Sequence, residues 1–502
     1  MDESTDQVIV RRRKLEALRA AGADPFAIRR CDRTHVASEI RERFDELDGR
    51  TVTIAGRLRE IRDHGKIAFG DVADQSGHVQ AFARLDQLGE EHFERFLQLD
   101  RGDFISVEGP VLKTKRGEIS VGVAKFRLLA KALRPLPKEW HGLRDIEQRY
   151  RQRYVDLLVN PATKELFIKR TKIVRAAREV LDERGFLEVE TPTLHAVAGG
   201  ALARPFVTHH NALGIDLYLR IATELHLKRL IVGGFERVYE IGRVFRNEGI
   251  SPKHNPEYTL LEAYQAYADY EDMMELTEAI VLRMVEAACG GSRFAFRGRE
   301  YDVAPPWPRI SLLDAIEEHA GVDLGNVTDD EEARRTAARL GVQVAEDATL
   351  GHIIDDIFDH FVVPHLQRPT FVVDYPTVIS PLAKRKADAP HLTDRFEPFI
   401  GGMEVGNAFS ELNDPVDQRQ RFIEQMKRRA GGDREAHQMD EDFLRALEYG
   451  MPPTGGLGLG IDRLVMILTD SDSLREVILF PLLRPEARSR GESEESDGGP
   501  DE

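Results

Sequence analysis

The sequence predicts an α+β protein with two main domains, a small N-terminal β-barrel and a larger domain whose mainly antiparallel sheet is flanked by helices. Between residues 51 and 130, five segments alternate apolar and polar residues and are separated by glycine, aspartate and charged turns. From residue 161 onward, strand-like and helical segments mix without the regular βαβ alternation of a doubly wound parallel sheet. A chain of 502 residues is also too long for one hydrophobic core.

Composition and charge argue against several classes of protein and of site. With 41% hydrophobic and 31% charged residues the chain is predicted to be globular, and no apolar run reaches the roughly 18 residues of a membrane span. The N-terminus lacks the apolar core of a signal peptide, so we expect a cytoplasmic location. A net charge of -17 argues against indiscriminate nucleic-acid binding but leaves a local basic surface open. Cys31 and Cys289 lie far apart, which argues against a structural zinc site.

The five alternating segments account for the barrel. They read TVTIAGRLREI, IAFGDVAD, HVQAFARL, DFISVEGPVL and EISVGVAKFRLLA. Five short strands with one helix-like segment, LGEEHFERFLQL, favour an OB-fold over another kind of β-sandwich. Before the barrel, residues 7–24 predict a helix whose basic residues 11–14 either form a solvated face or contact phosphates.

A proline-bearing stretch, ALRPLPKEWHG, marks the boundary between the two domains. The expected organisation is a helical extension at 1–48, the barrel at 49–134, a linker at 135–160, the larger domain at 161–486 and a disordered acidic tail at 487–502. Within the larger domain, FIKRTKIVRAAREVLDERG predicts a helix that ends at Gly185. Residues 328–346 and 415–450 predict helical surface insertions.

One segment of the larger domain, RVFRNEGISPKHNPEYTLLEAYQAYADY, predicts a hairpin with a charged loop. Residues two apart on a strand point the same way, so Arg246 and Glu248 would share one side of their strand, and Glu262 and Tyr264 would share a side of the returning strand, with all four pointing inward. Burying these polar groups costs too much desolvation for an ordinary core, which favours a binding site. The alternative is a surface hairpin with its polar face in water.

A second segment, RFEPFIGGMEVGNAFSELND, places Glu397, Glu404 and Glu411 seven residues apart in strand-like sequence. Asn407 and Phe409 alternate along the same face as Glu411. Carboxylates grouped in this way suit a hard divalent cation or a cationic ligand, while the alternative is a pair of solvent-exposed strands.

A third segment, TGGLGLGIDRLVMIL, predicts a glycine-rich strand that leads into an apolar helix with Arg463 near its start. No lysine follows the glycines, so this is not a P-loop. Glycines would let a ligand approach the sheet closely, although Arg463 taken alone could be an ordinary salt-bridge partner.

In their order along the chain, these segments resemble the signature motifs of class II aminoacyl-tRNA synthetases. The first motif is the helix and strand that end at Pro192, the second is the FRNEG hairpin and the third is the GLGIDR helix. RNEGISPKHNPEYT and GGMEVGNAFSELND are specifically similar to the lysyl-tRNA synthetase family. The resemblance covers residues 10–485, and it implies an OB-fold anticodon-binding domain followed by a class II catalytic domain.

The resemblance implies ATP-dependent attachment of L-lysine to its tRNA through a lysyl-adenylate. It implies L-lysine, ATP and a lysine-accepting tRNA as partners, Mg²⁺ as cofactor, and a homodimer with no membrane association. The implied catalytic residues are Arg246 and Arg463, and the implied metal ligands are Glu397 and Glu404. The implied ATP-binding residues are Arg246, Glu248, His254, Asn255, Tyr258 and Arg463. The implied lysine-binding residues are Gly200, Glu224, Arg246, Glu262, Tyr264, Asn407, Phe409 and Glu411, with Glu411 facing the ε-ammonium and Tyr264 hydrogen-bonded beside it.

In the barrel, the resemblance implies that Phe69 stacks on an anticodon base and Gln80 reads it, with further base contacts from Arg62 and Glu118. Without the resemblance, Phe69 would be interpreted as a core residue. Three positions depart from the family pattern, because Thr223, His226 and Lys253 stand where proline, tyrosine and arginine are expected.

Two other functions fit parts of the pattern. Aspartyl- and asparaginyl-tRNA synthetases share the barrel and the catalytic fold, but the FSELND segment with Tyr264 predicts a pocket for a cationic rather than an anionic side chain. A non-catalytic tRNA-binding protein derived from a synthetase would be expected to have lost some of Arg246, Glu404 and Arg463, and all three are present.

Overall fold

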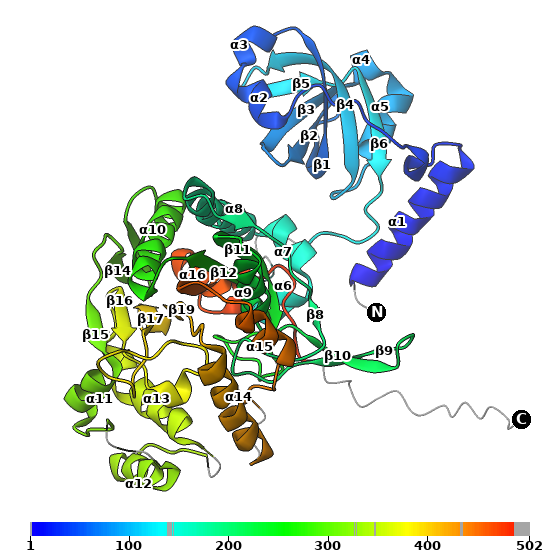
Figure 1. Ribbon diagram of the computed structural model, residues 1–502. Coiled ribbons are helices and arrows are strands. Elements are labelled where there is room, and N and C mark those ends of the chain that lie inside the picture. The colour runs from blue at the N-terminus through cyan, green and yellow to red at the C-terminus, as the bar shows by residue number, and fades with distance from the viewer. Residues whose placement is uncertain are drawn as a thin grey trace, which may run out of the picture. The chain divides into compact units, whose positions relative to one another are not determined.

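The computed structural model describes residues 3–137, 143, 145–325, 327, 329–345, 348–431 and 435–485. The chain divides into two compact units, Met1–Arg144 and Asp145–Glu502, coloured blue to cyan and cyan to red in Figure 1. The division falls inside the segment 135–160 that was expected to be a linker. The expected disorder of the tail at 487–502 concerns residues outside the described part of the chain.

The first unit contains the barrel. Its strands are β1 (Thr51–Asp63), β2 (Ile67–Asp74), β3 (Gly77–Arg84), β4 (Phe104–Lys113), β5 (Ile119–Gly122) and β6 (Lys125–Ala130). They are ordered β1-β2-β3-β5-β4-β6, and β1 also pairs with β4, so five strands close into a barrel. This confirms the predicted OB-fold, and the last predicted strand is divided into β5 and β6.

Short helices surround the barrel. They are α2 (Ala37–Glu42), α3 (Phe44–Leu47), α4 (Leu85–Leu88) and α5 (Glu90–Leu97). The predicted helix-like segment corresponds to α5, which buries Phe93 and Phe96 in the barrel core. Burying these two rings fixes the helix against the closed sheet.

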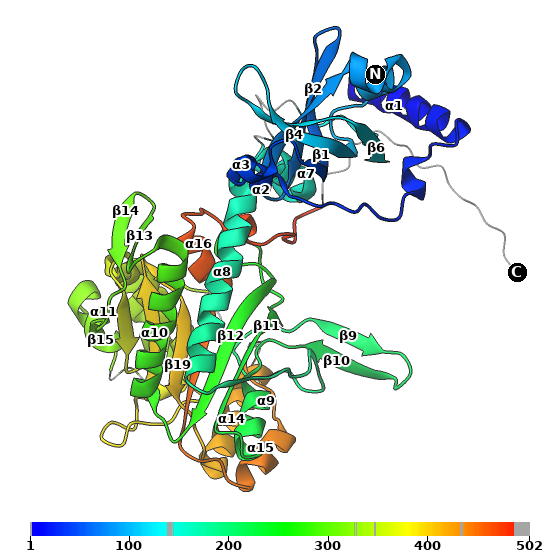
Figure 2. The same cartoon turned by 90° about the horizontal axis from the view of Figure 1, so that it is seen from above.

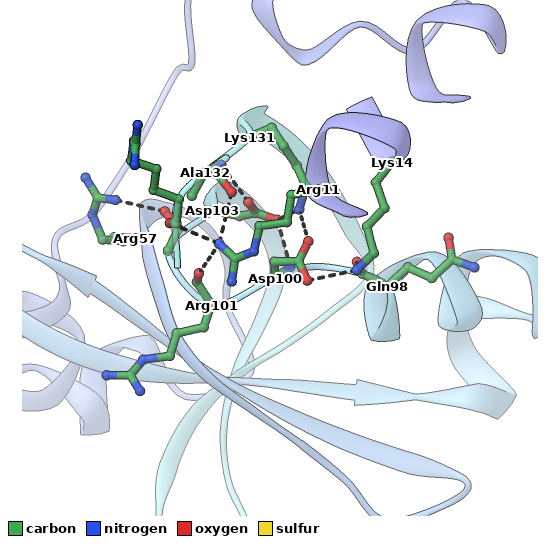
Figure 3. A network of polar contacts seen from close by, with 11 residues as sticks. Arg11, Lys14, Arg57, Gln98, Asp100, Arg101, Asp103, Lys131 and Ala132 are labelled. Carbon is green, nitrogen blue, oxygen red and sulfur yellow. Dashed lines mark hydrogen bonds and ion pairs between the residues drawn. The ribbon is translucent and has the colours of Figure 1, made fainter. Parts of the chain in front are cut away.

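The N-terminal helix α1 (Glu3–Ala20) docks on the barrel through its basic residues (Figure 3). The Arg11 side chain is 7% exposed, and its Nη1 donates hydrogen bonds to three backbone carbonyls, including Ala132 O at 3.0 Å. Lys14 Nζ donates to Asp100 Oδ1 at 2.8 Å. Both interpretations of this basic run are therefore wrong for Arg11, which anchors the helix. The helix ends before residue 24 because Gly22 takes a left-handed conformation, with φ of 71°.

The second unit is built on a nine-stranded sheet. Its main strands run in the order β15 (Arg309–Ser311), β16 (Thr370–Val373), β17 (Arg395–Ile400), β19 (Gly406–Ser410), β20 (Thr454–Gly460), β12 (Glu257–Ala266), β11 (Arg237–Phe245) and β7 (Leu187–Glu188), while β18 (Met403–Glu404) pairs with β17. Only the β7–β11 and β15–β16 pairs are parallel in this sheet. The prediction of a mainly antiparallel sheet is therefore confirmed.

Two long helices, α8 (Pro161–Glu183) and α10 (Tyr270–Cys289), lie side by side against this sheet (Figure 2). As predicted, α8 stops at Gly185, whose φ is 77°. The unit also contains α6 (Ile146–Arg151), α7 (Arg153–Val159), α9 (Glu224–Val232), α11 (Leu312–Ala320), α13 (Leu350–Phe361), α16 (Ile461–Leu468) and α17 (Leu474–Val477). The predicted insertions correspond to α12 (Asp330–Leu340), α14 (Pro415–Ala430) and α15 (Glu441–Glu448).

A three-stranded sheet forms an arm of the second unit, in the order β8 (Leu194–His195), β10 (Ile215–Leu219) and β9 (Val207–His210). The β9–β10 hairpin projects from the body of this unit (Figure 2). A separate hairpin joins β13 (Arg293–Phe296) to β14 (Arg299–Asp302). In the described part of the chain, we find no helix with the length and apolar character needed to cross a membrane.

Candidate active site

The sheet of the second unit separates a hydrophobic core from a cavity. Leu261 and Ala263 of β12 belong to the core that packs against α8 and α10. Glu262 and Tyr264 alternate with them and line a cavity of about 680 Å³. Because successive side chains of a strand point to opposite faces, the core pattern of β12 fixes which residues face the cavity.

This cavity brings together every residue that the resemblance implied for amino-acid, ATP and metal binding. They come from the loop before β9, the start of α9, the β11–β12 hairpin, strands β17 to β19 and helix α16. The set that lines the cavity is Gly200, Glu224, Arg246, Glu248, His254, Asn255, Tyr258, Glu262, Tyr264, Glu397, Glu404, Asn407, Phe409, Glu411 and Arg463. The alternative of solvent-exposed strands therefore does not hold for the carboxylates of this set.

Glycines of β20 form the floor of the cavity. In the sheet register, Gly458 lies between Glu262 and Asn407, and Gly456 lies between Tyr264 and Phe409. A Cβ atom at Gly456 would lie 2.7 Å from Tyr264 Cε1, far inside van der Waals contact. The glycine run thus lets side chains of the two neighbouring strands converge over β20.

The amino-acid end of the cavity is anionic. Glu224, Glu262 and Glu411 are only 6%, 4% and 1% exposed. Glu262 Oε1 accepts a hydrogen bond from the Thr223 backbone N–H at 2.9 Å, and Oε2 accepts one from the Tyr264 hydroxyl at 3.2 Å. The Tyr264 hydroxyl therefore donates to Glu262.

Burial destabilises the charged forms of these three carboxylates. It raises the pKa of Glu262 to about 7, and the charge of Glu224 adds to this shift. Burial also raises the pKa values of Glu224 and Glu411. Glu411 Oε1 has no hydrogen-bond partner among the described residues, so this end of the cavity is suited to receive a cationic group.

One cation that the sequence analysis did not single out reaches this end from behind the cavity wall. Lys228 of α9 is fully buried, and its Nζ lies 2.5 Å from Glu224 Oε1 and also contacts Glu411 Oε2. Burial alone would lower the pKa of Lys228, but the charges of Glu224 and Glu411 raise it above its usual value. Lys228 is therefore expected to carry its proton at neutral pH.

The other end of the cavity carries the residues implied for ATP. The guanidinium carbon of Arg246 lies 5.4 Å from the centroid of the Tyr258 ring, and Arg246 Nε has no hydrogen-bond partner among the described residues. Arg463 Nη1 donates to Glu404 Oε2 at 2.9 Å. The His254 ring contacts Ser251 Oγ at 2.9 Å, and burial lowers the pKa of His254. Two arginines facing an open space can bind a phosphate chain.

The prediction that Arg246 and Glu248 share one face of a strand is wrong, because β11 ends at Phe245. The Arg246 backbone N–H still donates to Pro256 O at 2.8 Å, and Glu248 N–H folds back onto Arg246 O at 2.8 Å. Both side chains nevertheless line the cavity, because the turn after β11 directs them there.

The two carboxylates implied for metal binding lie near this end. Glu397 accepts hydrogen bonds from Arg395 Nη2 at 2.6 Å and from the Tyr375 hydroxyl at 2.8 Å. The pKa of Glu397 is raised to about 7, because burial and the charge of Glu404 outweigh the opposing charge of Arg395. The pKa of Asp355 is raised in the same way, to about 7, by burial and by the charge of Glu397.

Such mutual repulsion between carboxylates fits a bound cation. Within the described ranges, however, no three His, Cys, Asp or Glu side chains are already arranged as metal ligands. A divalent ion held by Glu397 and Glu404 would therefore need further oxygen ligands from water or from phosphate.

The residues implied for anticodon binding lie in the first unit, on neighbouring strands of the barrel and directly before β5. Arg62 of β1 lies opposite Phe69 of β2, and Phe69 lies opposite Phe82 of β3. The Phe69 ring is half-buried and stacks on Phe82, with ring centroids 5.1 Å apart. Phe69 does not belong to the barrel core, so its interpretation as a core residue is wrong.

Gln80 lies on the adjoining strand β3, and Glu118 directly precedes β5. Gln80 of β3 pairs in register with Ser120 of β5, and the Ser120 hydroxyl donates to Gln80 Oε1 at 3.0 Å. Glu118 is exposed and lies two residues before Ser120. The four implied residues thus occupy a contiguous part of the barrel, with one aromatic ring and several polar groups available to a nucleobase.

Comparison with known proteins gives matches to both units. A family profile described as "OB-fold nucleic acid binding domain" matches residues 52–129, and one described as "tRNA synthetases class II (D, K and N)" matches residues 145–484. A lysine–tRNA ligase of Moorella thermoacetica is 58% identical over 485 residues, or 97% of this chain and 99% of the relative. Lysine–tRNA ligases of Thermoanaerobacter pseudethanolicus and Clostridium tetani are 56% and 52% identical, over 96% and 95% of this chain and 97% and 95% of their own lengths.

The chain belongs to the lysine–tRNA ligases, a family of class II tRNA synthetases. At Thr223, where the resemblance led us to expect proline, the backbone makes a hydrogen bond to the cavity. The backbone N–H of Thr223 donates to Glu262, and a proline at this position would have no N–H to donate. This hydrogen bond opposes the rise in the pKa of Glu262.

Several residues that hold the implied binding side chains in place were not predicted from the sequence of this lysine–tRNA ligase family member. Lys228 lies four residues after Glu224, a spacing at which helix side chains meet, so the pair could have been found. Arg395 lies two residues before Glu397 and donates to it, and Arg395 Nε also donates to Asn407 Oδ1 at 2.9 Å. Asp355 carries no local signal, because only the fold brings α13 to the cavity.

Proposed function

We infer that this protein attaches L-lysine to its cognate tRNA in two steps, through a lysyl-adenylate. The observation that carries this proposal is the anionic amino-acid end of the cavity, where Glu224, Glu262 and Glu411 lie buried together. Such a pocket favours an amino acid with a cationic side chain and repels aspartate, and it gives no reason to prefer the neutral asparagine. The high identity to lysine–tRNA ligases over nearly the whole chain supports the same function.

In the first step, a carboxylate oxygen of lysine attacks the α-phosphorus of ATP, and pyrophosphate leaves with the electrons of the broken P–O bond. Arg246 is placed to hold the α-phosphate and the lysine carboxylate together, since a guanidinium can donate to both as charge moves between them. Arg463 would lie against the adenine ring opposite Tyr258. The protein supplies alignment and charge neutralisation rather than covalent chemistry.

In the second step, a hydroxyl of the terminal adenosine of tRNA attacks the lysyl carbonyl carbon, and AMP leaves. We assign the ε-ammonium of lysine to Glu411, whose Oε1 is free to accept it. We assign the α-ammonium to Glu262 and Glu224. Gly200 supports this arrangement, because a Cβ atom there would lie 3.3 Å from Glu224 Cβ.

The remaining assignments follow the same cavity wall. Asn407 and Phe409 flank the lysine, while Glu248, His254 and Asn255 face ATP. Glu397 and Glu404 would hold Mg²⁺ together with phosphate oxygens. When bound, Mg²⁺ would offset the negative charge of the triphosphate and of the departing pyrophosphate.

We propose that the barrel reads the anticodon through Arg62, Phe69, Gln80 and Glu118. We also propose the division of labour expected from the sequence, with 49–134 for tRNA recognition and 161–486 for catalysis, joined by 135–160 and preceded by the extension 1–48. The stacked Phe69 ring at the surface of an OB-fold supports the first part. A cytoplasmic location is proposed because tRNA and ATP are found there.

We propose that the second unit pairs with a second copy of the chain. Large apolar side chains are exposed on neighbouring elements of this unit, namely Leu158, Ile168, Leu187, Leu194, Val207 and Ile215. Monomeric proteins seldom expose so many apolar groups together. Equilibrium sedimentation should give the mass of a dimer, and a monomer at micromolar concentration would contradict the proposal.

Transfer of radiolabelled lysine to tRNA tests the proposed function. Purified protein with ATP and Mg²⁺ should charge a lysine-accepting transcript with lysine, and omitting ATP should abolish charging. Aspartate and asparagine with their own tRNAs serve as the controls for the related specificities. Charging of tRNA with aspartate or asparagine in place of lysine would overturn the proposal.

A further inference from the structure

Lys228 occupies an unusual position at the amino-acid end of the cavity. It is completely buried, and no part of it lines the cavity. Its Nζ reaches Glu224 and Glu411, two of the carboxylates to which the proposed function assigns the substrate. An isolated ammonium would be very costly at this depth, so its environment must offset that cost.

Neighbouring groups compensate for the cost of burying the Lys228 ammonium. Glu224 lies one helical turn earlier on α9, so the pair is held by the helix geometry itself. The Phe409 and Phe443 rings face Nζ, with centroids at 5.5 and 5.9 Å. Aromatic faces and two carboxylates satisfy an ammonium without any water.

The net formal charge at this end of the cavity follows from four buried residues. Three buried carboxylates, Glu224, Glu262 and Glu411, contribute minus three when ionised, and Lys228 contributes plus one. With all three carboxylates ionised, as pairing with the ammonium groups of lysine requires, the wall carries minus two. Lysine brings two ammonium groups, while its carboxylate is assigned to Arg246 at the other end, so substrate and wall neutralise each other.

We propose that Lys228 is a positioning and specificity-determining residue for lysine. It acts as a built-in cation that sets the wall charge to minus two and holds Glu224 and Glu411 by one oxygen each. The other oxygen of Glu411 stays available for the ε-ammonium of the substrate. This inference rests on the proposed function, because it concerns how the same pocket matches its amino acid.

Other titratable groups near Lys228 do not change this count. The buried His437 has its pKa lowered to about 4 by burial and by the charge of Lys228, so it is neutral at pH 7. The charge of Arg395 acts on Glu224, but Arg395 is matched by Glu397 at 2.6 Å. The Tyr264 hydroxyl has its pKa raised by burial and by all three carboxylates and stays protonated.

Replacing Lys228 with methionine removes the charge and keeps the length of the side chain. Lys228→Met should raise the Kd and the KM for lysine at least about 30-fold, the lower range for breaking a buried charge pair. Its acid limb in kcat/KM for lysine should move to higher pH, because the carboxylates lose the cation that opposes their protonation. The KM for ATP should stay within a few-fold. Lys427→Met on α14, an exposed lysine, is the matched control and should behave as the wild type.

A second substitution separates charge balance from packing. Glu224→Gln alone leaves a wall of minus one and should weaken lysine binding. In the Lys228→Met background the same change restores minus two and should tighten lysine binding. Such a reversal of sign cannot come from lost packing, which would weaken binding in both backgrounds.

The experiment measures lysine Kd by calorimetry and lysine-dependent ATP–pyrophosphate exchange for the wild type, the three single variants and the double variant, with melting curves for each. If Lys228→Met melts below the assay temperature, Glu224→Gln and the double variant decide, because adding Lys228→Met to Glu224→Gln should tighten lysine binding. Weaker binding in that comparison, or losses that simply add, would overturn the role of Lys228. Wild-type protein that exchanges with another amino acid but not with lysine would instead refute the proposed function.

Discussion

Tyr264 and Glu411 approach each other across Gly456, the residue of β20 that lies opposite Tyr264 in the sheet. A Cβ atom at position 456 would lie 2.7 Å from Tyr264 Cε1 and would overlap Glu411 Oε1. The absence of a side chain at this one position therefore decides whether two side chains of the amino-acid end can keep their places.

Gly456→Ala should disable lysine activation while the protein stays folded. The methyl group must displace Tyr264 or Glu411, and we expect kcat/KM for lysine to fall by roughly 100-fold or more, as for misplacement by an ångström. The KM for ATP should change little. Gly291→Ala is the control, because a Cβ atom there meets nothing within 4 Å. Normal lysine exchange by Gly456→Ala would show that these side chains are not in the site.

Glu411→Gln should lower lysine activation and spare ATP binding. The change removes the charge that faces the ε-ammonium, and truncating one partner of a buried charge pair costs about 2–5 kcal/mol. This corresponds to a loss of tens-fold or more in kcat/KM for lysine. Lysine-dependent ATP–pyrophosphate exchange and ATP titration measure the two effects. An unchanged kcat/KM for lysine would remove Glu411 from the pocket.

The pKa of Glu262, about 7, predicts that kcat/KM for lysine decreases at acidic pH. Protonated Glu262 cannot pair with an ammonium, so kcat/KM for lysine should fall as pH drops below about 7 at saturating ATP and Mg²⁺. Because the folded-state pKa lies above the unfolded value, this carboxyl stabilises the free protein fully only below about pH 4.5 and loses that contribution as pH rises through about 7.

At high pH, bound lysine places an ammonium group beside ionised Glu262. The stabilisation of the protein by lysine should therefore also depend on pH. Saturating lysine should raise the Tm by more at pH 8 than at pH 6. Calorimetric melting with and without lysine checks this. A lysine-induced shift in Tm that is the same at both pH values would argue that Glu262 does not titrate in this range.

Phe69→Ala should separate tRNA recognition from lysine activation. Stacking of a base on an aromatic ring is worth about 1–3 kcal/mol, so kcat/KM for tRNA should fall by roughly 5- to 150-fold. Exchange of ATP and pyrophosphate should be unaffected. The loss should nearly vanish with a tRNA that already has a wrong base at that anticodon position, because both changes remove one contact.

Phe96→Ala is the matched control for this prediction, since Phe96 is fully buried in the barrel core. It should cost about 3–5 kcal/mol of stability and show as an earlier melting transition. Early melting by Phe69→Ala, with no selectivity for the anticodon base, would assign Phe69 to packing.

Local patterns were enough to predict most of the fold. Strict alternation over residues 51–130 predicted the barrel, and Gly185 predicted the end of α8, because both signals come from residues next to each other. Helix α1 was harder. Its basic run carries no pattern that separates Arg11 from its neighbours, and only the carbonyls at the end of β6 and nearby loops explain why Arg11 is buried.

The candidate site was predictable where its residues share a strand or match a family motif. Glu262 and Tyr264 follow from alternation on β12, and the structure places them opposite Asn407 and Phe409 across Gly458 and Gly456. Lys228 and Asp355 were missed for different reasons. Lys228 lies one helical turn after Glu224, a spacing that the sequence shows but that was not used, whereas Asp355 reaches the cavity from α13, which is distant in the chain.

ATP–pyrophosphate exchange with each of the twenty amino acids tests the central claim most directly. It needs no tRNA, so it reports only on the cavity that holds Glu262 and Glu411. Lysine should drive exchange well above every other amino acid, and aspartate and asparagine should remain at background. Exchange with aspartate or asparagine above that with lysine would contradict the account.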